Sequence, residues 1–128
     1  MGTRVLIVDD IPLMRRQIRS ALVPKGFEIL AEAADGYDGI LQYVEKRPDV
    51  VVLDIVMPGI DGLETLERLL RLDPKARVVM CSALGEREMI RRAIHLGARD
   101  FIVKPFAEER IVGAVGKAAD SGGYLPDA

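Results

Sequence analysis

The chain has 128 residues, enough to bury the core of one domain, and its 49% hydrophobic and 30% charged residues are ordinary for a soluble globular protein. A net charge of −2 without a run of basic residues argues against direct binding of nucleic acid. The single cysteine, Cys81, cannot form an internal disulfide, and no apolar stretch approaches the roughly 18 residues needed for membrane insertion. We therefore expect a cytoplasmic, monomeric domain.

Five short apolar runs alternate with five longer segments of helical periodicity. In chain order, strands are expected over residues 4–8, 27–33, 50–53, 77–81 and 100–103. A helix is expected after each strand, first between Asp10 and Gly26 and then over residues 36–46, 63–72, 86–96 and 108–119. The first, third and fourth runs are almost continuously apolar, which is typical of strands buried on both faces of a parallel sheet. These repeats predict an α/β fold of the (βα)5 type, a doubly wound, five-stranded parallel sheet.

Polar side chains follow the predicted strands at the edge where ligands bind in open α/β sheets, beyond the carboxyl ends of the strands. Asp9 and Asp10 follow the first strand, and Asp54 follows the third. Ser82 closes the fourth strand, and Lys104 follows the fifth. We expect these five side chains to form one site.

Three carboxylates at one edge would repel one another, because two unit charges about 4 Å apart cost about 4 kcal/mol at an effective dielectric constant near 20. Such a cluster favours a bound cation, and oxygen ligands with room for water suit Mg²⁺ or Mn²⁺. Lys104 adds a fixed positive charge and Ser82 a hydroxyl, which together suit phosphoryl transfer. Asp54 is the central carboxylate and the best candidate nucleophile, which would form an acyl phosphate.

Each of these residues also has a purely structural interpretation. Asp10 could serve only as the N-cap of the first helix. Asp54 could begin a loop, Ser82 could belong to a turn, and Lys104 could be a solvated charge. The coincidence of four strand ends favours the functional interpretation over these separate ones.

The segments that carry these residues resemble response regulator receiver domains: 5–10 (VLIVDD), 53–62 (LDIVMPGIDG), 81–83 (CSA) and 97–106 (GARDFIVKPF). The resemblance extends over residues 3–119, and the segment Met14-Arg15-Arg16 further resembles the chemotaxis subgroup of CheY-like single-domain regulators. It implies a receiver domain over residues 1–120, followed by a short C-terminal tail over residues 121–128. The strand order 2-1-3-4-5 is likewise taken from the family.

The resemblance assigns roles around the metal. Asp54 would be the phosphoacceptor. Asp10, Asp54 and the backbone carbonyl of Val56 would bind Mg²⁺, and Asp9 would act on the metal through water.

The resemblance also assigns the residues that respond to the phosphoryl group. Lys104 would contact it, and Ser82 would move toward it. Phe101 occupies the switch position of the family, and the bond between Lys104 and Pro105 would be cis.

The resemblance also implies that two positions tune dephosphorylation, and both are apolar in this chain. Val56 and Leu84 lie two residues beyond Asp54 and Ser82, where some family members carry Asn and Glu. Apolar side chains cannot orient a hydrolytic water, so we hypothesise slow self-dephosphorylation, with a long-lived phosphorylated state or reliance on a phosphatase.

The sequence thus predicts a two-component signalling switch that is not an enzyme beyond catalysing its own phosphorylation and slow dephosphorylation. A histidine kinase or phosphotransfer domain would supply the phosphoryl group. A downstream protein, in chemotaxis on the evidence of the resemblance, would bind the face formed by residues 86–96, 100–103 and 108–119. Arg15, Arg16 and Arg19 form a basic face that is either solvated or a dock for an acidic phosphodonor. Gly113 and Gly116, in the last helix, indicate either close packing on the sheet or a loosened helix.

Three alternatives remain at this point. The domain could come from a longer DNA-binding or enzymatic regulator. A flavodoxin-like carrier shares the predicted architecture, but Asp9 and Asp10 would repel a flavin phosphate. A phosphatase of the haloacid-dehalogenase type also uses an Asp nucleophile, but it requires a second Asp where this chain has Val56.

Overall fold

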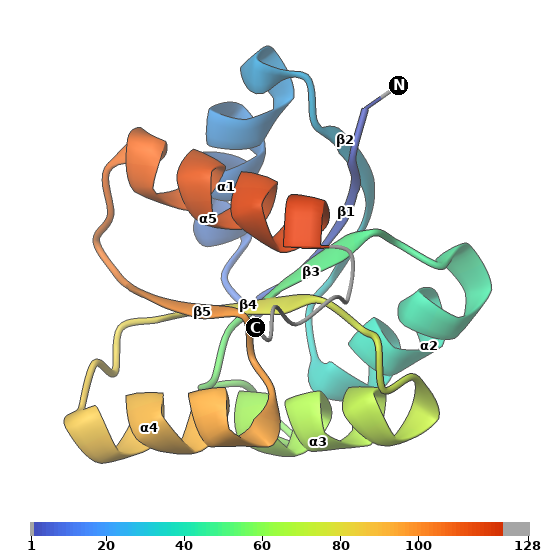
Figure 1. Ribbon diagram of the computed structural model, residues 1–128, viewed down its shortest axis with the longest axis vertical. Helices are drawn as coiled ribbons and strands as arrows, with labels where there is room; N and C mark the ends of the chain where they lie inside the picture. Colours follow the sequence, from blue (N-terminus) through green and yellow to red (C-terminus); the bar gives the residue numbers. More distant parts are fainter. Residues whose placement is uncertain (1, 122–128) are drawn as a thin grey trace.

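The computed structural model describes residues 2–121, and its centre is a five-stranded parallel sheet (Figure 1). The strands are β1 (Arg4–Val8), β2 (Glu28–Ala33), β3 (Val50–Leu53), β4 (Val78–Ser82) and β5 (Asp100–Val103). Their order across the sheet is β2-β1-β3-β4-β5, which confirms the predicted order and the doubly wound (βα)5 fold. Because β1 and β3 are neighbours, the chain reverses its winding direction between them, and ligand sites lie at such switch points.

The helices that connect the strands are α1 (Pro12–Leu22), α2 (Gly36–Lys46), α3 (Gly62–Leu72), α4 (Arg87–Leu96) and α5 (Glu108–Ser121). The first helix was expected to continue to Gly26, but a 3₁₀ helix, η1 (Val23–Lys25), replaces its last turn. Pro24 lies in that turn and has no N–H to continue the α-helical ladder. Gly26 then ends the segment with a φ of 95°, in the left-handed region that glycine adopts without strain.

The other predicted boundaries are within two residues of those observed. Helix α5 continues through Ser121, two residues past the expected end. The remainder of the predicted tail, residues 122–128, lies outside the described residues. No helix within residues 2–121 is both long and apolar enough to span a bilayer.

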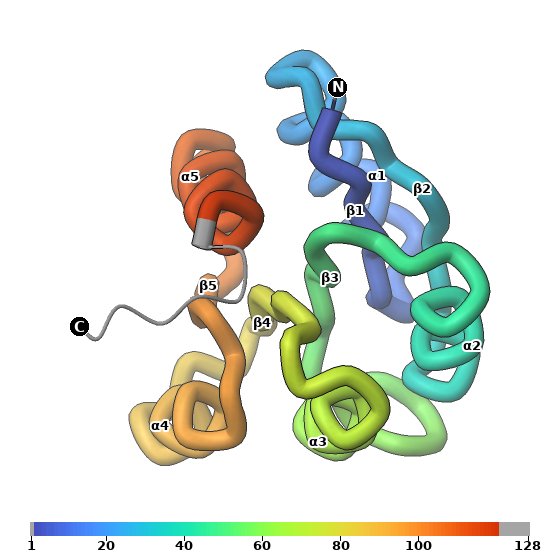
Figure 2. Tube along the Cα trace, turned by 45° about the vertical axis from the view of Figure 1, so that its right-hand side comes forward, coloured from blue at the N-terminus to red at the C-terminus, as the bar shows by residue number. Residues whose placement is uncertain are grey.

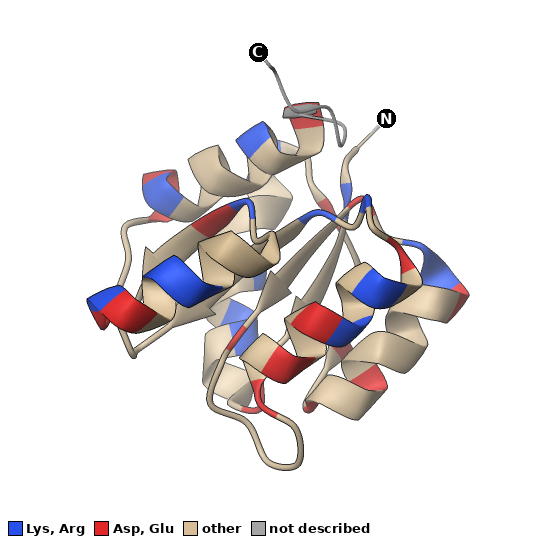
Figure 3. Cartoon of the chain, turned by 60° about the horizontal axis from the view of Figure 1, so that its bottom comes forward, with Lys and Arg blue, Asp and Glu red and all other residues tan. Residues whose placement is uncertain are grey.

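Two apolar layers hold the helices on the sheet. Helices α1 and α5 cover one face, and α2, α3 and α4 cover the other (Figure 2). Successive side chains of β1 point to opposite layers: Val5 and Ile7 pack under α1 and α5, whereas Leu6 and Val8 pack under α2 and α3. The strands carry little charge, and the charged residues are spread over the helices and loops (Figure 3). This burial on both faces explains the continuous apolar runs in the sequence.

The two glycines of α5 do not mark close packing on the sheet. A Cβ added at Gly113 would meet no atom within 4 Å, and one at Gly116 would meet only the ring tip of Phe27 at 4.0 Å. The interpretation as close packing is therefore wrong. A helix loosened by glycine stays a prediction.

Candidate functional site

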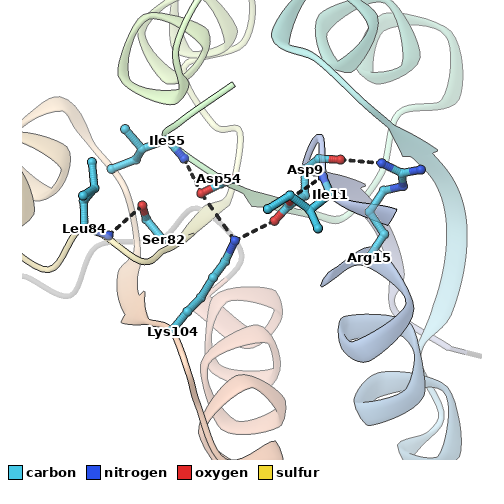
Figure 4. A network of polar contacts seen from close by, with 8 residues as sticks. All are labelled: Asp9, Ile11, Arg15, Asp54, Ile55, Ser82, Leu84 and Lys104. Carbon is cyan, nitrogen blue, oxygen red and sulfur yellow. Dashed lines mark hydrogen bonds and ion pairs between the residues drawn. The ribbon is translucent and has the colours of Figure 1, made fainter. Parts of the chain in front are cut away.

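The register of the sheet brings the predicted site residues to one edge. Val8 pairs with Leu53, so Asp9 and Asp54, each one residue further along, leave the sheet side by side. The backbone N–H of Asp54 donates to the carbonyl of Val8 at 2.9 Å. Lys104 follows β5, and its long side chain reaches back to both carboxylates (Figure 4).

Carboxylate oxygens of Asp9, Asp10 and Asp54 all lie within 4.8 Å of one another. Asp10 does not cap helix α1, because the N-cap residue is Ile11 and no side chain bonds to the exposed N–H groups there. The interpretation of Asp10 as an N-cap is therefore wrong. Its Oδ1 is buried and has no hydrogen-bond partner among the described residues. An unpaired buried carboxylate oxygen beside two more carboxylates fits a hard, oxygen-binding cation such as Mg²⁺.

Lys104 supplies the positive charge next to this cluster. Its Nζ donates to Oδ2 of Asp9 at 2.8 Å and lies 3.5 Å from Oδ1 of Asp54. Burial disfavours the ammonium form, but the hydrogen bond that Lys104 donates to Asp9 and the charge of Asp54 outweigh burial and raise the pKa of Lys104. The side chain therefore stays charged at neutral pH.

Asp54 is buried, which is unusual for a carboxylate. Its Oδ1 accepts a hydrogen bond from the backbone N–H of Ile55 at 2.8 Å. Burial raises the pKa of Asp54; the charge of Lys104 opposes this shift, and the charge of Asp9 adds to it. Without a bound cation, the ionised form of Asp54 is therefore destabilised in the folded state.

The loop after Asp54 folds back closely enough to require a glycine. The N–H of Gly62, at the start of α3, donates to the carbonyl of Ile55 at 2.7 Å. A Cβ at Gly62 would overlap the backbone carbonyl of Asp54. The glycine thus lets the helix start lie directly against the residue that carries the central carboxylate.

A cleft of about 890 Å³ opens over Asp54, and Ser82, Val56 and Leu84 are among the residues that line it. Ser82 is buried, and its Oγ accepts a hydrogen bond from the backbone N–H of Leu84 at 3.2 Å. Val56 is 57% exposed and Leu84 38% exposed, so both apolar side chains reach solvent at the cleft. A water molecule approaching Asp54 would find no polar group on either side chain.

Phe101 points into the core rather than into the cleft. It lies on β5, is buried, and belongs to the apolar layer that also contains Met80 and Ala93. The peptide bond between Lys104 and Pro105 is cis, as the family resemblance implies.

The predicted basic face on α1 is largely neutralised by a residue that the sequence did not single out. Glu32, on β2, forms ion pairs with Arg15 at 3.1 Å and with Arg19 at 2.6 Å. Burial raises the pKa of the Glu32 carboxyl, but the two arginines outweigh burial and lower it. The i, i+4 spacing of Arg15 and Arg19 indicates a shared helix face, but no local pattern points to a partner on a separate strand.

A model of the response regulator receiver domain matches residues 5–116 of the chain. The chain belongs to this family. Chemotaxis protein CheY of Bacillus subtilis (strain 168) is 46% identical over 117 residues, which cover 91% of this chain and 98% of that protein. CheY of Thermotoga maritima is 41% identical over 119 residues, or 93% of this chain and 99% of that protein.

Solved structures agree with the sequence relatives. A chain in the crystal structure of the CheX-CheY-BeF3-Mg²⁺ complex from Borrelia burgdorferi matches with a TM-score of 0.87 and 36% identity, covering 89% of this chain and 87% of that chain. The protein is therefore a receiver domain of the two-component response regulators, a signalling switch rather than a metabolic enzyme. These relatives favour the CheY-like interpretation over a DNA-binding or enzymatic regulator, a flavodoxin-like carrier or a phosphatase.

Proposed function

We propose that this receiver domain accepts a phosphoryl group on Asp54 in a Mg²⁺-dependent reaction, in which Mn²⁺ could replace Mg²⁺. One observation carries the proposal: oxygens of Asp9, Asp10 and Asp54 lie within 4.8 Å of one another, and the ammonium group of Lys104 contacts two of these carboxylates. Three closely spaced carboxylates, two of them buried, next to the fixed charge of Lys104 suit the binding of a divalent metal ion and a phosphoryl group together.

The carboxylates of Asp10 and Asp54 and the backbone carbonyl of Val56 would hold Mg²⁺, and Asp9 would act through water. When bound, Mg²⁺ supplies positive charge that offsets the carboxylates and the incoming phosphoryl oxygens. Lys104 would orient the phosphoryl group by contacting one of its oxygens, because its ammonium already lies between Asp9 and Asp54.

Asp54 would attack through Oδ2, because Oδ1 is held by the N–H of Ile55 and faces Lys104. A bond forms between Oδ2 and phosphorus as the bond between phosphorus and the imidazole nitrogen of a phosphohistidine breaks. The electron pair of the broken bond returns to the imidazole ring, whose other nitrogen keeps its proton and leaves the ring neutral. The donor is a histidine kinase or a phosphotransfer domain. The only chemistry of this chain is its own phosphorylation and slow dephosphorylation.

The phosphoryl group would act as a switch through Ser82 and Phe101. Ser82 is buried beside the cleft, so a turn of its hydroxyl toward the phosphoryl oxygens would free space next to β5. Phe101 would then repack and change the face formed by α4, β5 and α5. Ile94 and Val103 leave apolar side chains exposed on this face, which suits a protein partner that prefers one of the two conformations.

The apolar side chains of Val56 and Leu84 would make the phosphorylated state long-lived, because neither can hydrogen-bond an attacking water. A separate phosphatase would then end the signal. Since CheY proteins are the relatives, we place the chain in the cytoplasm, as a monomer in chemotaxis signalling.

The test is phosphorylation by acetyl phosphate in Mg²⁺, followed by mass spectrometry of the intact protein. The wild type is expected to gain the mass of one phosphoryl group, and Asp54→Asn to gain none. Asp120→Asn, at an exposed position of α5, is the matched control and should be phosphorylated like the wild type. Equal phosphorylation of Asp54→Asn, or none of the wild type, would refute the proposal.

A further inference from the structure

Arg15 reaches from α1 back to the turn that carries the first two carboxylates. Its Nη1 donates to the backbone carbonyl of Asp9 at 2.6 Å, and its Nε donates to Oε1 of Glu32 at 3.1 Å (Figure 4 shows the contact with Asp9). Its side chain is only 19% exposed, although it belongs to the helix surface. The guanidinium thus joins a strand side chain to the backbone of the site.

Glu32 is a rigid support for this contact. It lies on β2 and pairs with Ile7 in the sheet, so its position relative to β1 is set by the strand ladder. Its second oxygen accepts from Nε of Arg19 at 2.8 Å. Both carboxylate oxygens of Glu32 are thus engaged. Because the guanidinium of Arg15 is planar and its N–H donors have fixed directions, this contact holds it in one orientation.

The carbonyl of Asp9 matters because it sets the direction of the turn. The peptide unit that contains this carbonyl is planar and also contains the N–H of Asp10, so a bond to the oxygen orients both residues. The other polar groups of Asp9 are held as well, since its N–H donates to Ala33, Oδ1 accepts from Ile11, and Oδ2 accepts from Lys104.

Asp10 is held differently. Its Oδ1 is buried and has no hydrogen-bond partner among residues 2–121, so within the described chain no contact with that oxygen fixes its direction. The orientation of this carboxylate therefore depends on the backbone turn before it, which Arg15 fixes from the carbonyl side.

We propose that Arg15, supported by Glu32, is a positioning residue for the cation site: it fixes the turn after β1 so that the carboxylates of Asp9 and Asp10 face Asp54. In this role Arg15 would contact neither the cation nor the phosphoryl group, because its donors are engaged by Glu32 and by the backbone carbonyl of Asp9. The proposal rests on the proposed function for the identity of the ion, Mg²⁺. Support of this kind for metal ligands commonly changes metal affinity by about 10-fold to 100-fold.

The positioning effect of Arg15 and the through-space effect of its charge change the Mg²⁺ affinity in opposite directions, so an experiment can distinguish them. Through space, a positive charge repels Mg²⁺, so its removal alone would tighten binding. Loss of positioning would instead weaken Mg²⁺ binding. Arg15→Met removes the charge and both hydrogen bonds but keeps an unbranched stem to pack on the helix surface. We expect it to weaken Mg²⁺ binding by about 10-fold or more. Arg15→Lys keeps one donor within reach of the carbonyl and should recover part of the loss.

The experiment measures the Mg²⁺ dissociation constant by isothermal titration calorimetry, without a phosphodonor. Arg68→Met is the matched control, because Arg68 makes a comparable 2.6 Å ion pair with Glu64 on α3, away from the site. Glu32→Gln is measured in the wild-type and in the Arg15→Met background. If Glu32 acts through Arg15, its substitution weakens binding in the first background and changes it less than twofold in the second.

Three results would overturn the proposal: Arg15→Met binds Mg²⁺ as tightly as the wild type or more tightly, Arg68→Met weakens binding equally, or Glu32→Gln has the same effect in both backgrounds. Thermal unfolding in EDTA shows whether each variant is folded. If Arg15→Met does not fold, Arg15→Lys serves as the test variant. Mg²⁺ binding by Arg15→Lys that equals wild-type binding would then overturn the proposal. A wild type that binds Mg²⁺ but is not phosphorylated would refute the proposed function and leave this inference standing.

Discussion

Replacing Asp54 by Asn is expected to stabilise the metal-free protein. At an effective dielectric constant near 20, the attraction between Asp54 and Lys104 across 3.5 Å is worth about 5 kcal/mol. The repulsion of Asp54 by Asp9 and Asp10, whose oxygens lie within 4.8 Å, costs about 3.5 kcal/mol or more for each. Neutralisation therefore removes a net repulsion of about 2 kcal/mol. The amide oxygen of Asn can still accept the hydrogen bond from Ile55.

A gain of this size should raise the midpoint of thermal unfolding by about 6–8 °C for a domain of this length. The assay is thermal unfolding followed by circular dichroism in EDTA at pH 7.5, for the wild type, Asp54→Asn and the control Asp120→Asn. The control is expected to unfold with the wild type. If Asp54→Asn unfolds at or below the temperature of the wild type, the carboxylate cluster is not repulsive and the reasoning is wrong.

The pH dependence has a definite sign. Because burial raises the pKa of Asp54 above its ordinary 3.8, the folded state binds this proton more tightly than the unfolded state. The proton on Asp54 therefore contributes to the stability of the fold in full at pH values below 3.8, and this contribution is lost as the pH rises through the raised pKa of Asp54 in the folded state. The advantage of Asp54→Asn should therefore shrink as pH falls toward 3.8, the ordinary pKa of the group. Adding Mg²⁺ should also shrink it, because a ligand at 100 times its dissociation constant stabilises the wild type by about 2.7 kcal/mol.

Three further outcomes are expected. Gly62→Ala should lower the free energy of unfolding by about 1–3 kcal/mol in urea titrations, because the new Cβ overlaps the carbonyl of Asp54; an unchanged value would contradict the close approach. Gly113→Ala should raise the same quantity by about 1 kcal/mol, since its Cβ meets no atom within 4 Å, and a loss would show that the helix needs glycine there. Val56→Asn should speed decay of the phosphorylated protein, measured by phosphate release, because an amide can orient water; an unchanged rate would end the idea that Val56 slows dephosphorylation.

Much of the fold could be predicted because it depends on local patterns. The apolar runs of β1, β3 and β4 are short and continuous, and glycine or proline interrupts the chain near several element ends. The site residues could be predicted for a related reason, since residues that follow parallel strands must meet at one edge. Asp9, Asp54 and Lys104 lie there because of strand register alone.

Two of the structural interpretations that the sequence left open are wrong. The interpretation of Asp10 as a cap was reasonable from its place before a helix, but the helix begins one residue later, at the N-cap Ile11. Gly113 suggested close packing, but whether a helix position faces the sheet or solvent depends on the docking angle of the whole helix. Neither the exact start of a helix nor the direction that one of its residues faces can be read from a short stretch of neighbouring residues.

The sequence by itself determined the order of strands and helices, the edge at which the acidic residues collect and the family to which the chain belongs. Only the tertiary structure decided which polar groups are paired. It showed that both oxygens of Asp9 are engaged, that one oxygen of Asp10 lacks a partner within residues 2–121, and that Arg15 joins Glu32 to the backbone of the site. The physical reason is that hydrophobic periodicity reflects local secondary structure and burial. A hydrogen bond such as that between Arg15 and Glu32, 17 residues apart, depends instead on how two separate segments pack.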